Sequence, residues 1–223
     1  TRSSTNFNDQ GAGLVVENSA TATLIRCAFV RNRSLGLAVR SLGRLAASHL
    51  VVSDTAVSAA TGVDGAGLDA YEAGQLTLDH AFFARNHSAG LAVTGTTATL
   101  QDVEVRATTR SVADDASSGL LFGSGSSVSL QRLRVSQSER VGALLNNARV
   151  TGTDLVVADS QVISGAGTDG AGLAVQGGND SRNKRPYCFV STRLSKMTTM
   201  PRSEAVRMRR PNPWRNFKMD SGR

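Results

Sequence analysis

Residues 29–39 read FVRNRSLGLAV and residues 83–93 read FARNHSAGLAV, so the two segments are identical at eight of eleven positions. A match of this kind indicates an internal repeat, which has to be recognised before any element is assigned. Outward from these two copies, a glycine followed by a small or apolar residue recurs along the chain at Gly13, Gly36, Gly67, Gly90, Gly119, Gly142 and Gly172. The successive spacings are 23, 31, 23, 29, 23 and 30, so short and long units alternate.

Each unit contains three short apolar runs. The first opens at the glycine, and the other two follow within the same unit. Many of the runs alternate apolar with polar residues, as in Val103–Arg106 and Leu133–Ser136, which is the period expected of strands with one buried face. They are too short for ordinary helices, and Gly, Ser, Thr, Asn and Asp separate them. The sequence therefore predicts three short strands per unit and very little helix.

Units of this length leave no room for a crossover helix, so we expect the chain to coil on itself. Each strand would then pair with its equivalent one turn later, and the inward Leu, Val and Ala side chains would stack in ladders. The predicted fold is an all-β, right-handed parallel β-helix solenoid of about seven coils. A leucine-rich repeat is the obvious rival, but it needs a regular Leu and Asn pattern of constant length.

The GxGLxV openings, the RN and SDT turns and the Ala, Gly, Thr and Val bias resemble the parallel β-helix repeat proteins of the pectin-lyase-like superfamily. More narrowly, they are similar to secreted repeat proteins predicted from high-GC bacterial genomes. The resemblance covers residues 1 to about 177. It implies the fold and an extracellular or cell-surface location, and it says little about activity.

The net charge of +7 lies almost entirely at one end of the chain. Residues 179–223 contain 12 Lys or Arg and three acidic residues, whereas residues 1–178 contain 13 basic and 15 acidic residues. All Pro, Met, Lys and Trp residues also lie after Gly178. We therefore predict a repeat domain over residues 1–177 and a basic non-repeat tail over residues 178–223.

Three interpretations of the tail stay open. It could be a disordered basic arm that binds nucleic acid, a cap on the open end of the coil, or sequence that was read out of frame or joined from elsewhere. We favour the third because the repeat breaks partway through a unit.

Acidic residues recur three to five positions ahead of the repeated glycines, mostly in the longer units. These residues are Asp9, Asp64, Asp114, Asp115 and Asp169. In register, they would form an acidic row along one edge, with successive sites about 10 Å apart. Carboxylates at that separation cannot share one ion, which leaves separate Ca²⁺ sites, a sugar-binding groove, or the ordinary turn chemistry of Asp-Gly. We favour turn chemistry.

No catalytic residue is assigned. Asp114 and Asp115 could form an acid and base pair as in glycoside hydrolysis, but the NTD, GHG and RIK segments of the β-helix polygalacturonases are absent from the sequence. The dense acidic cluster of pectate lyases is absent as well. The histidines His49, His80 and His87 show no recognisable ligand spacing, and Cys27 and Cys188 do not make a disulfide framework.

The expected function is that of a non-catalytic, exported or cell-surface module with a structural, adhesive or glycan-recognition role. Its expected partners are glycans or other cell-surface proteins. A fragment of a carbohydrate-active lyase or hydrolase is the first alternative, and nucleic-acid binding through the tail is the second. No apolar run approaches the roughly 20 residues that span a bilayer, and we expect any export signal to lie outside this sequence.

Overall fold

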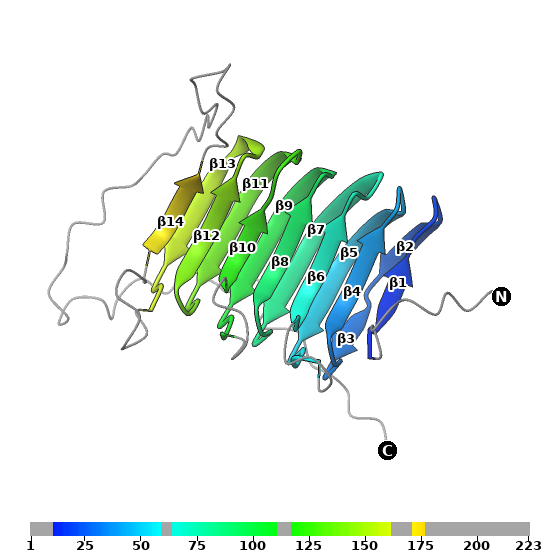
Figure 1. Ribbon diagram of the computed structural model, residues 1–223, viewed down its shortest axis with the longest axis horizontal. Coiled ribbons are helices and arrows are strands. Elements are labelled where there is room, and N and C mark those ends of the chain that lie inside the picture. The colour runs from blue at the N-terminus through cyan, green and yellow to red at the C-terminus, as the bar shows by residue number, and fades with distance from the viewer. Residues whose placement is uncertain (1–10, 59–63, 111–116, 162–170, 177–223) are drawn as a thin grey trace, which may run out of the picture. The chain divides into compact units, whose positions relative to one another are not determined.

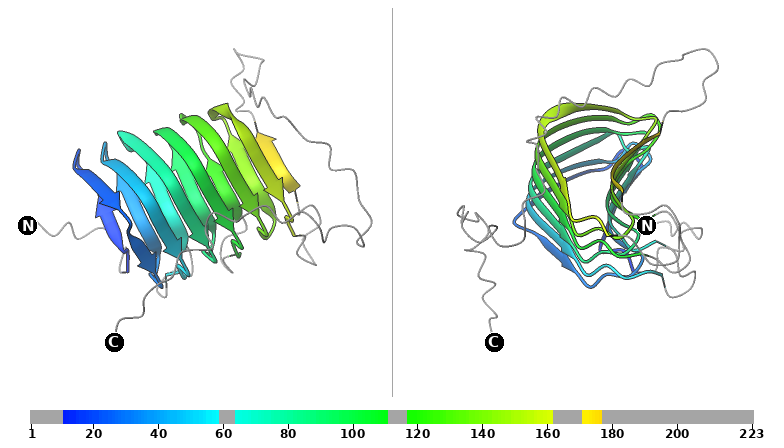
Figure 2. Two further views of the ribbon diagram at one scale, coloured as in Figure 1. Left: turned by 180° about the vertical axis from the view of Figure 1, so that it is seen from behind. Right: turned by 90° about the vertical axis from the view of Figure 1, so that its left-hand side faces the viewer.

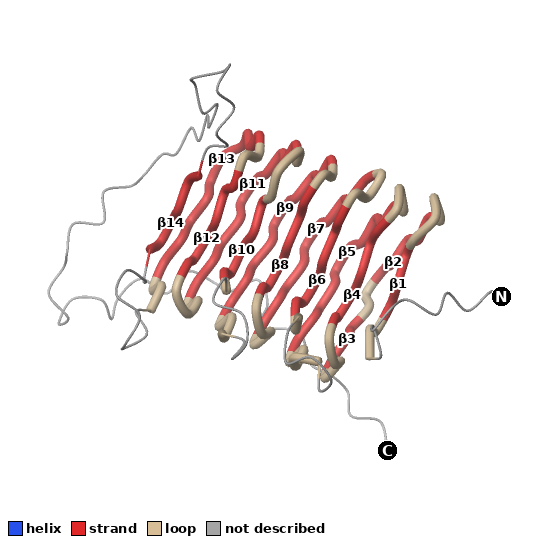
Figure 3. Tube along the Cα trace, in the orientation of Figure 1, coloured by secondary structure: helices blue, strands red, loops and turns tan. Residues whose placement is uncertain are grey.

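The computed structural model describes residues 11–58, 64–110, 117–161 and 171–176. All of them belong to one compact unit, residues 1–192. They form strands and turns and no helix (Figure 3), as the apolar patterns predict. Accordingly, none of the described residues belongs to a helix with the length and apolar character that crossing a membrane would take. The predicted tail, residues 178–223, lies outside the described residues.

The strands form two sheets, between which the chain alternates. Sheet A contains the shorter strands β1 (Leu14–Val16), β4 (Leu35–Arg40), β6 (Ala66–Tyr71), β8 (Ala89–Thr94), β10 (Ser118–Phe122), β12 (Val141–Asn146) and β14 (Ala171–Gln176). Sheet B contains β2 (Thr21–Ile25), β3 (Ala28–Val30), β5 (Arg44–Ser53), β7 (Gln75–Ala84), β9 (Thr97–Arg106), β11 (Ser127–Ser136) and β13 (Arg149–Ala158).

Every strand pair in both sheets is parallel. Sheet A runs β1-β4-β6-β8-β10-β12-β14, and sheet B runs from β13 through β11, β9, β7 and β5 to β2, with β3 also on β5. Each strand therefore pairs with its equivalent from the next turn of the chain, and the turns stack in chain order (Figure 1). The end-on view in Figure 2 shows the two sheets as opposite walls of one coil. A parallel, all-β repeat architecture is thereby confirmed.

The repeated glycines form one row across sheet A. Leu35 pairs with Ala66 and Leu37 with Leu68, so Gly36 lies beside Gly67, and the flanking pairs place the other glycines in the same way. Inside the stack this row has no space for a side chain. A Cβ on Gly119 would meet the side chains of Ser138 and Val135 and the carbonyl oxygen of Gly142. The glycine is therefore required by close packing, which explains why the repeat is anchored on it.

Equivalent inward side chains from successive coils fill the interior. In sheet A the row after the glycines is entirely buried at Leu37, Leu68, Leu91 and Leu120. Sheet B contributes a facing row of Val52, Phe83, Val105 and Val135, each fully buried. The predicted ladders of Leu and Val are present, and together they make one continuous core cluster.

The expectation of three strands per unit is wrong for most of the chain. Among the described strands, the second and third apolar runs belong to one ten-residue strand in β5, β7, β9, β11 and β13, whereas β2 and β3 keep them separate. The two runs join because both halves of the strand keep their pairing to the same neighbour, as β7 does with β9 on both sides of His80. A residue with positive φ lies at the junction and bends the strand without ending it.

A row of polar side chains lies at the corner that follows sheet B. Asn86 is fully buried there. Its Nδ2 donates to the carbonyl of Val52 at 3.2 Å, and its Oδ1 accepts from the backbone N–H of Thr55 at 3.1 Å. The side chain thus joins adjacent coils by satisfying buried backbone groups.

We predict that Gly119→Ala lowers the free energy of unfolding by about 1 to 3 kcal/mol, because the added methyl group overpacks the corner between two coils. Gly172→Ala is the matched control, since a Cβ there would meet only Val157, at 3.9 Å. Urea denaturation measures both variants. Equal stability of the two would contradict the packing explanation.

We predict that Asn86→Ala costs about 1 to 3 kcal/mol, because it leaves the buried N–H of Thr55 without its acceptor. Asn146→Ala removes an exposed amide at the end of β12 and should change the unfolding free energy by less than about 0.5 kcal/mol. Thermal and urea unfolding test the difference. Loss of the same stability in both variants would rule out a special role for the buried amide.

Candidate functional site

The candidate site lies on the outer face of sheet B, where the long strands bend. One residue per coil has a positive φ at this point, and we call this row the bend ladder: Arg26 (55°), His49 (54°), His80 (53°), Asp102 (52°), Arg132 (53°) and Asp154 (59°). Left-handed geometry is uncommon outside glycine. Because it recurs in six successive coils, it is a property of the scaffold and not a strain confined to one position.

The bend interrupts the alternation of buried and exposed side chains along the strand. Leu78 and Ala81 are buried, whereas Asp79 and His80 between them are partly exposed. Two consecutive side chains therefore face outward, and a second row, polar except for Ile25, runs beside the bend ladder. Its members are Ile25, Ser48, Asp79, Gln101, Gln131 and Thr153, which are paired in register across sheet B. We call the two rows together the polar strip.

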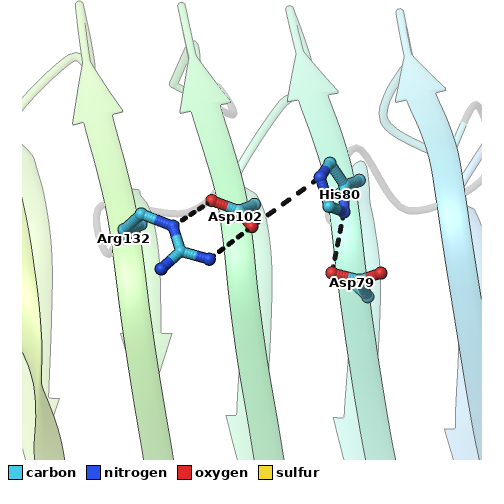
Figure 4. Close-up of polar contacts among 4 residues, drawn as sticks. All are labelled: Asp79, His80, Asp102 and Arg132. Carbon is cyan, nitrogen blue, oxygen red and sulfur yellow. Dashed lines mark hydrogen bonds and ion pairs between the residues drawn. The ribbon is translucent and has the colours of Figure 1, made fainter.

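Side chains of the bend ladder contact one another from coil to coil. The rings of His49 and His80 stack with centroids 5.0 Å apart and planes within 5°. Nε2 of His80 lies 3.7 Å from Oδ2 of Asp102. Arg132 then binds both oxygens of Asp102, from Nε at 2.5 Å and from Nη2 at 2.7 Å (Figure 4). The contacts run without a break across four strands.

The imidazole of His80 lies between two carboxylates. Its Nδ1 is 2.7 Å from Oδ1 of Asp79 on the same strand, and its Nε2 faces Asp102 on the next strand (Figure 4). An ionised carboxylate only accepts hydrogen bonds, so the short contact assigns a proton to Nδ1. One oxygen or nitrogen from each of Asp79, His80 and Asp102 lies within 4.8 Å of the others. Among the described residues, this is the group whose atoms could hold a metal ion.

The local charges lower the pKa of Asp102. The hydrogen bonds from Arg132 are the largest cause, and the positive charges of Arg132 and His80 act in the same direction, whereas burial opposes them. The same contact raises the pKa of Arg132. Both groups are therefore ionised at neutral pH, and the pair holds the middle of the bend ladder in one arrangement.

A bidentate ion pair between coils is not unique to this site. Arg85 binds Asp54 of the preceding coil at 2.6 and 2.7 Å, at the turn that follows sheet B, and lowers the pKa of that carboxyl. Such cross-strand pairs stabilise the stack. The distinctive feature of the bend ladder is the histidine held between two carboxylates.

The acidic row predicted from the sequence cannot be placed as a row. Asp9, Asp114, Asp115 and Asp169 lie outside the described residues. Asp64 is exposed, has a φ of 66° and accepts a hydrogen bond from the hydroxyl of Ser34 at 3.3 Å. Its geometry is that of an Asp-Gly turn, and it lies away from the polar strip in the chain, just before β6.

Reasoning from sequence missed Asp79, Asp102 and Arg132, and it dismissed His80 for want of a ligand spacing. The signal that could have found them is the register of the second apolar run. Leu76 and Leu78 pair with Ala98 and Leu100, and the same register places His80 beside Asp102.

No protein-family model matches the chain, and comparisons with curated proteins and with solved structures gave no significant match.

We predict that the lowered pKa of Asp102 makes folding sensitive to acid. A carboxyl whose pKa is depressed in the folded state stabilises the fold above its unfolded pKa and loses that contribution as the pH falls through its folded value. Asp102→Asn and Arg132→Gln should each flatten the fall in stability below about pH 4, measured by urea unfolding across pH. Arg134→Gln, two residues further along the same strand, should leave the fall in stability at low pH unchanged. If Asp102→Asn and Arg132→Gln both lose stability at low pH as the unmodified protein does, the ion pair is not the cause of the acid sensitivity.

Proposed function

We propose that the chain is a right-handed parallel β-helix of about seven coils, related to the pectin-lyase-like repeat proteins. The seven strands of sheet A, one per turn, support the coil number. The strong preference of parallel strand connections for right-handed crossovers supports the hand. We further propose that it acts at the cell surface or outside the cell as a non-catalytic structural or adhesive module that recognises glycans.

The polar strip is the observation that carries this proposal. It offers two outward side chains per coil, spaced by the distance of about 4.8 Å between neighbouring strands. Its groups include hydroxyls, amides, imidazoles, carboxylates and guanidinium groups, which both donate and accept hydrogen bonds. A straight row of such groups on rigid strands suits a linear polymer with many hydroxyls, since regular strands position binding groups better than loops do.

A carbohydrate-active lyase or hydrolase fragment is the alternative, and one contact favours it. The hydrogen bond between Asp79 and His80 orients an imidazole in the way that general bases are oriented. Turnover separates the two functions, because an enzyme would cleave the polysaccharide that it binds, whereas a recognition module would release it intact. Nucleic-acid binding through residues 178–223 is the second alternative, and it concerns residues that lie outside the described ones.

We predict that the protein binds at least one class of neutral, acidic or amino polysaccharide without cleaving it, in an immobilised-glycan screen followed by calorimetry. The double variant Gln101→Ala, Gln131→Ala removes two paired, exposed amides from the centre of the polar strip. It should weaken binding about tenfold or more, which corresponds to about 1.4 kcal/mol.

Asn146→Ala, on sheet A, is the control and should bind as the unmodified protein does. Circular dichroism verifies that all variants are folded. An absence of binding across the screen, or an unchanged affinity in the double variant, would refute glycan recognition by the polar strip. Release of shortened products would favour the enzyme.

A further inference from the structure

We propose that His80 and Asp102 bind a divalent transition-metal ion such as Zn²⁺, with Asp79 as the carboxylate that orients the imidazole. The ligand atoms are Nε2 of His80 and Oδ2 of Asp102, and water completes the coordination. This site does not depend on glycan recognition, and the two can be tested separately.

The first argument is the spacing of the two ligand atoms. They lie 3.7 Å apart, which is longer than a normal N–H···O hydrogen bond. Zn–N and Zn–O bonds of about 2.0 to 2.2 Å at a tetrahedral angle place two ligand atoms about 3.4 Å apart. A small side-chain movement would therefore bring both atoms to one ion.

The second argument is the contact on the other side of the ring. Histidines that bind metals usually donate their second N–H to a carboxylate, which fixes the tautomer and raises the basicity of the ligating nitrogen. Asp79 accepts from Nδ1 at 2.7 Å (Figure 4). With Nδ1 held by Asp79, Nε2 is the ring nitrogen that faces Oδ2 of Asp102. The three groups therefore have the arrangement of a metal-binding histidine with its orienting carboxylate and a second ligand.

The charge around the site also suits a divalent cation. The carboxylates of Asp79, Asp102 and Asp154 all act electrostatically on Arg132, so three acidic side chains lie near one guanidinium. The next outward pair on the same strands, Glu104 and Arg134, is in register and adds no net charge. Arg132 already donates to Oδ2 of Asp102, but a carboxylate oxygen has a second lone pair.

The ligand types select the class of metal. An imidazole suits Zn²⁺, Cu²⁺ and Ni²⁺, whereas Ca²⁺ takes six to eight oxygen ligands. The side chains of His80 and Asp102 are 41% and 23% exposed, so solvent can reach the remaining coordination positions. The site is thus distinct in chemistry from the Ca²⁺ sites that the acidic row suggested.

Calorimetric titration of the tag-free protein with ZnCl₂ at pH 7 tests the proposal. We expect saturable binding of one equivalent that involves His80, with no competition from excess CaCl₂. His80→Asn keeps a residue type that tolerates positive φ, and it should weaken this binding at least tenfold, as should Asp102→Asn. Asp79→Ala should weaken it by about 10- to 100-fold, as loss of a group that orients a ligand does.

His87→Ala is the matched control, because His87 is also partly exposed but contacts the hydroxyl of Thr109, at 3.2 Å. It should leave the affinity unchanged. As a second readout, substoichiometric Cu²⁺ should broaden the imidazole NMR signals of His80 and spare those of His87. The proposal is overturned if no saturable binding is seen, or if His80→Asn and Asp102→Asn bind Zn²⁺ as the unmodified protein does. If the protein binds a glycan but not Zn²⁺, only the metal site is refuted. If it binds Zn²⁺ but no glycan, only glycan recognition is refuted.

Discussion

Parallel, in-register stacking of successive coils is the constraint on which the rest of the structure depends. The strands of one coil do not pair with each other, so their backbone groups must pair with the strands of the coils on either side. That pairing fixes which residues become neighbours. It sets the glycines in one row, where the carbonyl of the next coil leaves no space for a Cβ, and it brings equivalent Leu and Val side chains together in the interior.

The same register produces the candidate site. A left-handed residue at the middle of each long strand turns two consecutive side chains outward, and stacking aligns these pairs from coil to coil. His80 and Asp102 belong to different coils and become neighbours for this reason alone. The bend serves the scaffold in every coil, whereas the chemistry depends on which side chain each coil places there. Arginine and aspartate at adjacent positions form an ion pair, and histidine beside aspartate forms a site for a cation.

The sequence was sufficient to predict the all-β repeat and the alignment of the glycines, because a glycine required by packing recurs at the same position of each unit. It was insufficient for the bend. The six residues of the bend ladder are Arg, His and Asp, and none is the glycine that most strongly signals a positive φ. The second and third apolar runs therefore looked like separate strands. The site was missed for a related reason, since ligand spacings were sought within one unit, whereas His80 and Asp102 belong to two.

The spacing between coils tests this account most directly. Spin labels at Thr151 and at Thr23, five coils apart in the outer row of sheet B, should be separated by about 24 Å at the backbone. Moving the second label from Thr23 to Ala46 and then to Thr77 should shorten the distance measured by pulsed electron spin resonance by about 4.8 Å at each step. Distances that do not fall in equal steps, or that are broadly distributed at all three positions, would contradict the stacked, in-register coil.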